Sequence, residues 1–441
     1  MKPELDNQSV HRYMRVYNYY KQLILSGQLT PGNKLPSIRR CAAELEMSRT
    51  TVETAYMVLA AEGYILAKPQ SGFYVTDIAE ARKKAEFLES KSPAQEPPIL
   101  YNFVSASVDK KSFQFELWRR YIKSALRQDE RLLSYGEPQG EYDLREVICR
   151  YLQNNRNVIC TPEHIVIGAG VQSLFHILCP LIRERRKVAF HNPDFKQGRA
   201  IFEDHGFALC NTAQGEKPDI YYISPSQATP WGGVLSVQQR MELIREAAGQ
   251  DILLIEDDYN SEFCYYHHPA PSIQGLAGGE GVVYLGTFSR LLLPSIRLSF
   301  MVLPSKLLKL YQRRRDVYNQ TASKAEQIAL CQFIRDGHLE SQIRKSRKIY
   351  QMKTKALCSE TEKIFGEKAR MTPCEAGFLS LLELCTEEGA AELAARARKE
   401  GIAVLPAQPE GGKTRLMLSC ASVPAEKYPE ALRRLYQCVY G

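Results

Sequence analysis

The sequence contains no long uninterrupted hydrophobic run, and this absence excludes several classes of protein. One apolar stretch, residues 282–304, is interrupted by Arg290 and Arg297, so it falls short of the roughly 20 apolar residues of a membrane helix. The first ten residues lack the apolar core of a secretion signal. We therefore expect a soluble, cytoplasmic protein with no membrane partner.

Cysteine occurs twelve times but never as a Cys-x-x-Cys pair, and the chain has no internal repeat or low-complexity segment. In a long chain without a secretion signal, scattered cysteines are typical of reduced core residues. We therefore expect neither a disulfide framework nor a bound metal.

The overall amino-acid composition is that of a globular protein. Of 441 residues, 44% are hydrophobic and 24% are charged, which allows a sizeable core and, by length, two or three domains. The formal net charge is +8, and residues 1–76 contribute +3 through nine basic and six acidic side chains. This balance permits an anionic partner without requiring one.

Residues 10–76 have the pattern of three helices followed by a β-hairpin. Apolar residues recur at three- and four-residue spacing from Tyr13 to Ile24, and again after Ser37 and after Ser48, two serines suited to N-capping. Two short strands are expected at 64–67 and 72–75. The turn between them has the character of a wing that contacts DNA.

The start of the third helix carries side chains suited to DNA. Ser48, Thr50 and Thr51 place hydroxyl groups beside free backbone N–H groups, a combination that suits phosphate oxygens. Arg49 can donate two hydrogen bonds to a guanine edge. Arg39 begins the preceding helix and can contact a neighbouring phosphate. The alternative for these few residues is an ordinary capped helix that faces solvent.

Residues 77–98 differ in composition from the segment before them. They are rich in charged residues, poor in large apolar side chains and end in prolines. We expect a short helix that passes into a tether. A segment of this length spans about 26 Å as a flexible coil and up to roughly 70 Å when extended. The tether separates the first module from residues 99–441.

From residue 99 onward, strand and helix patterns alternate, which predicts an α/β domain with a mainly parallel sheet. The division we expect is a large part, about 99–320, and a small α+β part, about 321–441. In the large part, helices are expected at 172–184 and 237–248, and strands at 164–169, 187–191, 207–212, 219–223, 252–256, 282–286 and 297–303. In the small part we expect a long helix at 338–364, strands at 378–383 and 415–420, and a last helix at 426–439.

Three segments at strand ends carry groups that can bind a phosphorylated ring. Residues 168–172 follow a strand and open a helix, so their backbone N–H groups suit a phosphate. Asp257 and Tyr259 follow a buried strand, where a carboxylate can pair with a protonated ring nitrogen and a phenol with a ring hydroxyl. Ser289 and Arg297 can grip a phosphate dianion. Taken singly, the first is more simply explained as a tight turn, and the other two are equally well explained as a strand end and a surface loop.

Three motifs cover nearly all of residues 15–76: Gly-Gln-Leu-x-Pro-Gly-x-Lys-Leu-Pro-Ser-x-Arg at 27–39, Ser-Arg-x-Thr-Val at 48–52 and Ala-Tyr-x-x-Leu-x-x-Glu-Gly-Tyr at 55–64. Together they closely resemble the winged helix-turn-helix of the GntR family. The resemblance implies binding to a double-stranded DNA operator. Glu53 is expected on the same exposed face, where many relatives carry a basic residue. The implied DNA contacts are Arg39, Ser48, Arg49, Thr50 and Thr51.

Further motifs occur between residues 99 and 441: Tyr-Gly-Glu-Pro-Gln-Gly at 135–140 with Leu-Arg at 144–145, Asp-Asp-Tyr-x-Ser-Glu-Phe at 257–263, Tyr-Leu-Gly-Thr-Phe-Ser at 284–289 and Arg-Leu at 415–416. They resemble the fold-type-I aminotransferases. More specifically, the whole chain resembles the MocR family, which joins a GntR winged helix to an aminotransferase-like domain. The resemblance also implies a homodimer, because the sites of these families lie at a dimer interface.

The MocR resemblance implies a site for pyridoxal 5'-phosphate. Asp257 would pair with the pyridine nitrogen and Tyr259 would bond the ring hydroxyl, while Phe195 would stack on the ring. Arg415 would receive a ligand carboxylate. The residues that would hold the phosphate are Val171, Gln172, Ser289 and Arg297.

The sequence departs from the family at the position that defines its chemistry. Where the family motif Thr-Phe-Ser-Lys supplies the lysine that forms a Schiff base with the cofactor aldehyde, this chain has Arg290. A guanidinium stays protonated and delocalised, so it is a poor imine-forming nucleophile. Residues 225–232 also depart, reading Pro-Ser-Gln-Ala-Thr-Pro-Trp-Gly where relatives commonly have Pro-Ser-His-Gln-aromatic-Pro-Thr-Gly. We therefore expect no catalytic residue, and a cofactor that is held non-covalently or lost.

Three hypotheses follow for the function. The first is a DNA-binding transcription regulator whose aminotransferase-like domain binds pyridoxal phosphate or a related ligand. A small-molecule effector, either an amino acid or a vitamin B6 derivative, would then change operator occupancy. The second is an active pyridoxal-phosphate-dependent aminotransferase with an accessory DNA-binding module. The third is a regulator whose large domain has abandoned the cofactor and senses another anion or a partner protein.

Overall fold

The computed structural model describes residues 12–77, 98–104, 107–192, 195–265, 270–410 and 413–441. Its contacts divide the chain into two units, residues 1–96 and 97–441. The helix and tether expected at 77–98 lie almost entirely outside the described residues. Within the described ranges, no helix combines the length and the apolar character that crossing a membrane requires.

The first unit has the expected three helices and hairpin. The Ser37 hydroxyl accepts a hydrogen bond from the backbone N–H of Arg40 at 3.3 Å, and the Ser48 hydroxyl accepts one from Thr51 at 3.1 Å, so both serines are N-caps. The two strands pair antiparallel. The elements are α1 (Arg12–Leu25), α2 (Ile38–Glu44), α3 (Arg49–Ala61), β1 (Ile65–Lys68) and β2 (Gly72–Val75).

One face of α3 anchors this unit and the other is left open. Val52, Tyr56 and Leu59 are fully buried against α1 and α2. The Tyr56 ring packs edge-on against Tyr20 of α1, with ring centroids 5.5 Å apart. Because a helix buries one stripe of side chains, the opposite stripe of α3 is exposed to solvent.

The second unit contains one sheet of seven strands in the order β4-β10-β9-β8-β7-β5-β6, and all seven strands expected in the large part are present. β10 runs antiparallel to β4 and β9, whereas the other pairs are parallel, so the expected mainly parallel sheet is confirmed. β6 is shorter than expected, because it lies at the sheet edge and pairs with β5 alone. The strands are β4 (Ile165–Gly168), β5 (Lys187–Phe190), β6 (Ala208–Leu209), β7 (Ile220–Ile223), β8 (Leu253–Asp257), β9 (Val282–Thr287) and β10 (Ser299–Val302).

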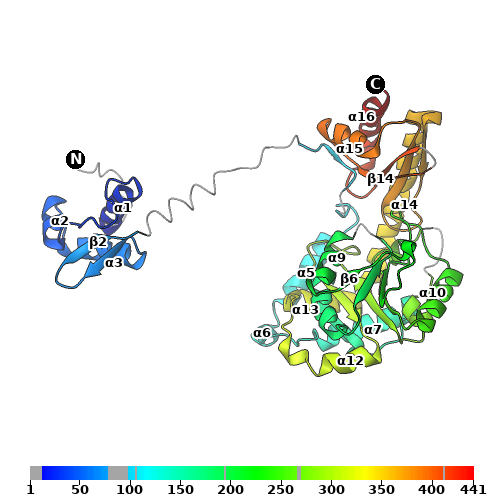
Figure 1. Cartoon of the computed structure of the whole chain (residues 1–441), viewed down its shortest axis with the longest axis horizontal. Coiled ribbons are helices and arrows are strands. Elements are labelled where there is room, and N and C mark those ends of the chain that lie inside the picture. Colours follow the sequence, from blue (N-terminus) through cyan, green and yellow to red (C-terminus); the bar gives the residue numbers. More distant parts are fainter. Residues whose placement is uncertain (1–11, 78–97, 105–106, 193–194, 266–269, 411–412) are drawn as a thin grey trace. The chain divides into compact units, whose positions relative to one another are not determined.

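Helices cover both faces of this sheet and make a three-layered structure (Figure 1). One face packs against α8 (Val171–Leu181), α9 (Lys196–Asp204) and α12 (Ser305–Gln312). The opposite face packs against helices that share two further clusters of buried side chains. Those helices are α5 (Phe115–Ala125), α7 (Tyr142–Arg156), α10 (Val237–Gly249), α11 (Ile273–Leu276) and α13 (Lys324–Arg335), and a short helix α6 (Asp129–Leu132) precedes α7.

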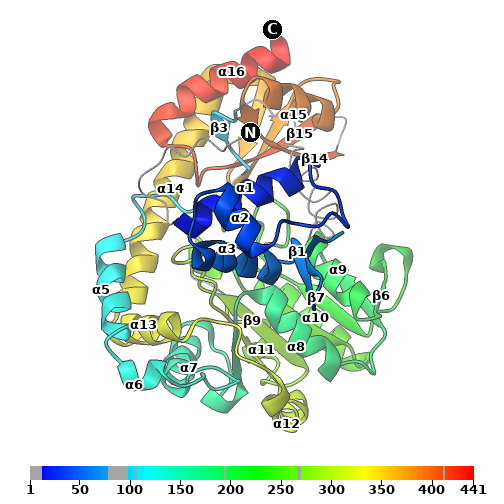
Figure 2. The same cartoon turned by 90° about the vertical axis from the view of Figure 1, so that its left-hand side faces the viewer.

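The small part is built on a four-stranded antiparallel sheet in the order β11-β12-β15-β14. The long helix α14 runs from beside α13 to α16, as Figure 2 shows. Helix α13 packs against α5 and α7 of the large part, and the division expected near residue 320 stays a prediction. The elements are β3 (Tyr101–Asn102), α14 (His338–Phe365), β11 (Ala369–Thr372), β12 (Leu379–Leu384), α15 (Ala390–Lys399), β13 (Ile402–Ala403), β14 (Leu405–Glu410), β15 (Lys413–Ser419) and α16 (Tyr428–Tyr440), with β3 and β13 paired in parallel.

A buried ion pair fixes the end of β8 to α7. The guanidinium of Arg156, at the end of α7, donates to Asp258 at 2.7 Å, and the Tyr284 hydroxyl donates to the same carboxylate at 2.7 Å. The Arg156 and Asp258 side chains are 2% and 1% exposed. Burial alone would raise the pKa of Asp258, but the charge of Arg156 and the Tyr284 bond bring it below its usual value.

We expect Arg156→Ala to destabilise the second unit by about 3–5 kcal/mol, because the change leaves the buried Asp258 charge without its partner. Both tryptophans, Trp118 and Trp231, lie in this unit, so denaturant unfolding followed by tryptophan fluorescence measures it selectively. The matched control is Arg150→Ala on the same helix, whose ion pair with Glu146 is exposed and is worth about 0–1 kcal/mol. Equal effects of the two substitutions would contradict the prediction.

Candidate functional site

A pocket of the second unit lies where the strands end. Parallel strands carry their carboxyl ends to one edge of a sheet, which is where ligands bind in open α/β sheets. The carboxyl ends of β4, β5, β7, β8 and β9 and the amino end of β10 all contribute side chains to a pocket with a cavity volume of about 420 Å³. Arg290 lines this pocket. So do all seven residues that the resemblance assigns to the cofactor, which are Val171, Gln172, Phe195, Asp257, Tyr259, Ser289 and Arg297.

One side of the pocket is a helix N-terminus faced by an arginine. Gly170 precedes α8 with a φ of +96°, and a Cβ atom at this position would overlap the Arg297 guanidinium. Glycine is therefore required both for the backbone conformation and for the close approach of Arg297. The first N–H groups of a helix have no partner within it. Together, the N–H groups of α8 and the Arg297 guanidinium make a cradle suited to a dianion.

Ser289 lies beside this cradle at the end of β9. Its hydroxyl donates a hydrogen bond to the carbonyl of Ile296 at 2.8 Å, which ties the loop after β9 to the start of β10. The Ser299 hydroxyl donates to Thr287 across the same two strands at 2.8 Å. These bonds hold the loop that carries Arg290 and Arg297.

Asp257 is the acidic residue of β8 that faces the pocket. Side chains alternate along a strand, so Asp257 points into the pocket while Glu256 and Asp258 point to the opposite face. The Tyr222 hydroxyl donates a hydrogen bond to the Asp257 carboxylate. The other oxygen, Oδ1, is buried and has no hydrogen-bond partner among the described residues. Burial raises the pKa of Asp257 to about 7.

Arg290 lies between two aromatic rings. Its Cζ atom is 5.2 Å from the ring centroid of Tyr259 and 5.2 Å from that of Phe378. Burial raises the pKa of the Tyr259 phenol to about 12, so it stays protonated and able to donate at neutral pH. Phe378 is itself held by Tyr350, with ring centroids 4.3 Å apart. Stacking of this kind holds a guanidinium in place while leaving its N–H groups free at the edge.

Phe195 closes another side of the pocket. Its ring packs over Gly198, where a Cβ atom would overlap it, and its centroid lies 5.5 Å from that of Tyr222. Tyr222 also lines the pocket, although it was not predicted as a site residue. Two adjacent tyrosines inside an apolar strand were the signal in the sequence that could have identified it. Asn192, Ser224, Thr287 and Ser299 were also not named as candidates.

The loop at 225–232, which departs from the family motif, makes its own contacts. The Asn260 amide donates a hydrogen bond to the Gln227 side chain, and the Gln227 amide donates to the carbonyl of Pro230 at 2.7 Å. Asn260 Oδ1 and the Ser226 hydroxyl are buried without a hydrogen-bond partner among the described residues. Gln227 thus occupies a packed position on the loop.

Arg415 does not line the pocket. It lies on β15 directly opposite Glu383 of β12, and its guanidinium donates to that carboxylate at 2.7 and 3.0 Å. The carboxylate beside Arg415 is therefore supplied by the chain itself. That Arg415 receives the carboxylate of a ligand stays a prediction.

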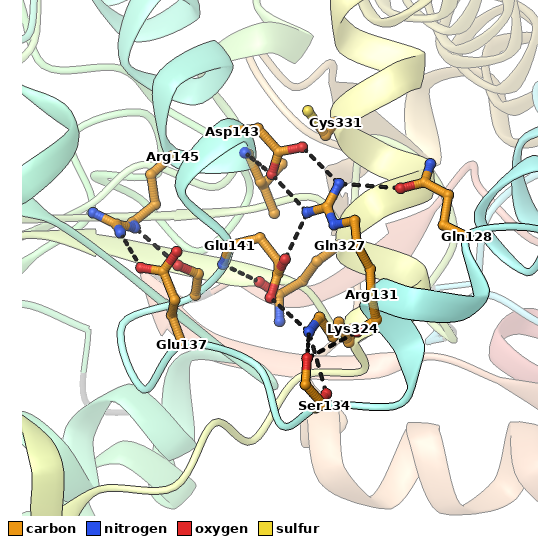
Figure 3. Close-up of polar contacts among 12 residues, drawn as sticks. Gln128, Arg131, Ser134, Glu137, Glu141, Asp143, Arg145, Lys324, Gln327 and Cys331 are labelled. Atoms are coloured by element: carbon orange, nitrogen blue, oxygen red, sulfur yellow. Dashed lines mark hydrogen bonds and ion pairs between the residues drawn. The ribbon is translucent and has the colours of Figure 1, made fainter.

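The loop that contains the 135–140 motif is fixed by charged side chains (Figure 3). Arg131 donates to Glu141 at 2.6 Å and to Asp143 at 3.0 Å, and the Lys324 ammonium donates to the Ser134 hydroxyl at 3.0 Å. Arg145 donates to Glu137 at 2.7 Å. Two large apolar side chains on the loop point to solvent, since Leu133 is 89% exposed and Tyr135 is fully exposed.

The expected DNA-contacting residues gather at the amino ends of α2 and α3. The Ser48 hydroxyl lies 2.9 and 2.7 Å from the hydroxyls of Thr50 and Thr51, so the cap and the first helical turn form one hydroxyl cluster. Arg39, Ser48, Arg49 and Thr50 are exposed, and Thr51 is half-buried. Glu53 is exposed one turn after Arg49, as expected.

The chain is similar to known proteins along both units. The family model of bacterial regulatory proteins of the gntR family matches residues 12–75, and that of aminotransferase class I and II matches residues 106–435. The HTH-type transcriptional regulator YdeL of Bacillus subtilis, an uncharacterized protein, is 35% identical, and the alignment covers 89% of this chain and 88% of the relative. The probable rhizopine catabolism regulatory protein MocR of Rhizobium meliloti is 29% identical over 79% of this chain and 77% of the relative.

A solved structure shows the same fold in the second unit. LysN, the α-aminoadipate aminotransferase of Thermus thermophilus, matches with a TM-score of 0.67 at 24% identity and covers 77% of this chain and 92% of that one. That crystal structure holds N-(5'-phosphopyridoxyl)-L-leucine. The expected fold-type-I aminotransferase fold is thereby confirmed.

We expect Asp257→Asn to stabilise the second unit at pH 8 by roughly 2–4 kcal/mol, with the gain vanishing near pH 4. An unfolded chain ionises this carboxyl near pH 4, whereas the folded chain does so near its raised pKa of about 7, so stability is lost as the pH rises through that window. Tryptophan-monitored unfolding at several pH values measures the difference. In the control, Asp316→Asn at an exposed site, the difference should be small at every pH. An Asp257→Asn gain that is independent of pH would refute this explanation.

Proposed function

Because the chain belongs to the MocR-type family, in which a GntR-type module precedes an aminotransferase class I and II domain, we propose that it is a DNA-binding transcription regulator whose pocket holds pyridoxal phosphate or a related ligand non-covalently. The first module binds the operator, and the ligand in the second unit changes operator occupancy. The effector is an amino acid or a vitamin B6 derivative.

The fit of the pocket to the cofactor rests on groups that face into it. The N–H groups of Val171 and Gln172, with Arg297 and Ser289, suit the phosphate, and Gly170 leaves room for the Arg297 guanidinium. Tyr259 suits the ring hydroxyl and Phe195 the ring face. The observation that carries the proposal is the buried, unpartnered Oδ1 of Asp257, since a buried carboxylate oxygen calls for a donor such as a protonated ring nitrogen.

The residue at position 290 favours binding over turnover. Bound pyridoxal phosphate supplies an electron-withdrawing ring that can accept negative charge from an attached substrate. Use of that property in amino-group transfer needs a side chain that bonds to the cofactor and then moves a proton. A guanidinium is a poor nucleophile and a poor proton carrier, and Arg290 contacts the rings of Tyr259 and Phe378, so it suits neither role. The chain is therefore a sensor, and the alternative of an active aminotransferase is not favoured.

We propose further that the active form is a homodimer. Leu133 and Tyr135 are large apolar side chains held out to solvent by the fixed loop of Figure 3, and burying them against a second copy removes this surface from water. Two DNA-binding modules on one operator increase their joint affinity through a high effective concentration. The half-sites are then spaced near multiples of a helical turn.

For the DNA-binding module, we expect Arg49→Ala to lower affinity by about 1–3 kcal/mol, or roughly five- to 150-fold, for a duplex selected from a random pool by the wild-type protein. The loss arises because a guanine edge loses its bidentate donor. Fluorescence anisotropy at moderate salt measures it, and the wild-type complex should contain two chains per duplex.

The matched control in this module is Arg40→Ala, an exposed arginine whose guanidinium already donates to Glu44 at 2.7 Å. It should change affinity much less. If the selection yields no sequence that binds better than random DNA, the module does not recognise an operator and this part of the proposal fails.

For the pocket, we expect a cofactor titration of Arg290→Lys to restore a covalent bond that the wild type cannot form. A desolvated lysine can lose its proton and attack the cofactor aldehyde, and the remaining cradle is present in the pocket. Borohydride reduction followed by peptide mass spectrometry should locate the cofactor at the substituted position. The wild-type protein should bind the cofactor, seen as a rise in melting temperature, without being labelled in this peptide.

Two outcomes of the same experiment would redirect the proposal. Amino-group transfer by the wild-type protein, with the cofactor trapped on another lysine, would support the aminotransferase. The absence of any thermal shift with pyridoxal phosphate would support a regulator that senses another anion or a partner protein.

A further inference from the structure

Arg290 is a positive charge placed in the pocket beside groups that already have other roles. Its guanidinium carbon lies 5.2 Å from the ring centroids of both Tyr259 and Phe378, two cation–π contacts that leave its N–H groups able to donate to a ligand. Arg297 lies against the N-terminus of α8, where the phosphate is proposed to bind, and Arg415 already contacts Glu383. Arg290 is thus the pocket arginine left to contact another part of the ligand.

The other anchors define which part of the ligand that is. On the proposed function, Asp257 pairs with the ring nitrogen, Tyr259 with the hydroxyl at position 3, and the helix N-terminus with the phosphate carried on position 5. In a pyridine ring, position 4 is opposite the nitrogen and adjacent to positions 3 and 5. Because Arg290 contacts Tyr259, whose phenol is assigned to position 3, and Arg297 is assigned to the phosphate on position 5, we assign Arg290 to the group at position 4 between them.

We propose that this pocket selects among vitamin B6 phosphates by the group at ring position 4, accepting an aldehyde or another oxygen acceptor and rejecting an ammonium group. This inference rests on the proposed function and names its ligand as the aldehyde form. A guanidinium has only donors, so it bonds a carbonyl oxygen but has nothing to offer an ammonium, which also has only donors.

The charges in the pocket make the discrimination large. The pyridinium pairs with Asp257, and the phosphate lies at the other side of the ring beside Arg297, so Arg290 is the positive charge placed for position 4. The aminomethyl group of pyridoxamine phosphate would add a second positive charge beside it. Like charges brought together away from water repel strongly, which is the usual basis for rejecting one of two similar ligands.

A lysine in the same position would act in the opposite way. It bonds the aldehyde covalently and, once neutral, tolerates an amine beside it, so an enzyme can hold both forms of the cofactor in turn. Replacement by arginine therefore turns a site that accepts both forms into one that distinguishes them. The regulator responds to the aldehyde form and ignores the amine form.

The test is a calorimetric titration of the full-length wild-type protein with pyridoxal phosphate, pyridoxine phosphate and pyridoxamine phosphate, in an amine-free buffer. We expect both oxygen-bearing ligands to bind at least tenfold more tightly than pyridoxamine phosphate. The alcohol is included because it cannot react with surface lysines, so its affinity reports the pocket alone.

Two variants of similar side-chain size, one neutral and one negative, test the charge at position 290. In Arg290→Gln the preference should shrink to within about threefold, and in Arg290→Glu it should invert in favour of the amine. The control Arg297→Gln, at the phosphate cradle, should weaken all three ligands by a similar factor and leave their ratios unchanged. Melting temperatures without ligand check that each variant is folded.

The outcomes separate this inference from the proposed function. Equal affinity of the wild-type protein for the aldehyde and the amine would overturn the selection while leaving a cofactor-binding regulator in place. A wild-type preference that persists in Arg290→Gln and Arg290→Glu would show that another residue is responsible, and would also overturn it. If none of the three ligands binds, the proposed function fails and the selection fails with it.

Discussion

The pocket depends on one constraint, which is the alternation of three acidic side chains at the buried end of β8. Asp258 is held on one face by Arg156 and Tyr284, and Glu256 accepts hydrogen bonds from the backbone N–H groups of Ile273 and Gln274 on the same face. These contacts fix the register of the strand. Because successive side chains of a strand point to opposite faces of the sheet, Asp257 then faces the pocket. A charged network on one side of the sheet thus positions a buried carboxylate on the other, with one oxygen unpartnered among the described residues and lining the pocket.

Much of this arrangement could be predicted from the sequence because it follows from strand ends. Most strands of the large sheet are short buried apolar runs, and in a mainly parallel sheet the residues after such runs meet at one edge. That is why the candidates at 171–172, 257–259 and 289–297 line one pocket although they are distant in the chain. β14 was not among the predicted strands; it contains Pro406 and lies at a sheet edge, where proline is tolerated.

What the sequence could not provide is the set of contacts between distant segments. The pairing of Arg415 with Glu383 depends on the register of β12 with β15, and no local pattern specifies register. The contact of Arg290 with Phe378 joins the large part to the small part, and the bond from Tyr222 to Asp257 joins neighbouring strands through their side chains. The sequence identified the substitution of lysine by arginine, but only the structure gives that arginine its two aromatic neighbours.

On the proposed function, this substitution changes the kind of signal that the protein can carry. A cofactor joined to a lysine is a resident group, and its occupancy is nearly independent of its concentration. A ligand held only by hydrogen bonds, stacking and charge leaves whenever its concentration falls below its dissociation constant, so occupancy follows supply. Because a ligand shifts a conformational equilibrium only through its different affinities for the two states, reversible binding is what allows the pocket to report a concentration to the DNA-binding module. On that proposal, arginine in place of the lysine is what makes occupancy of this pocket follow the supply of its ligand.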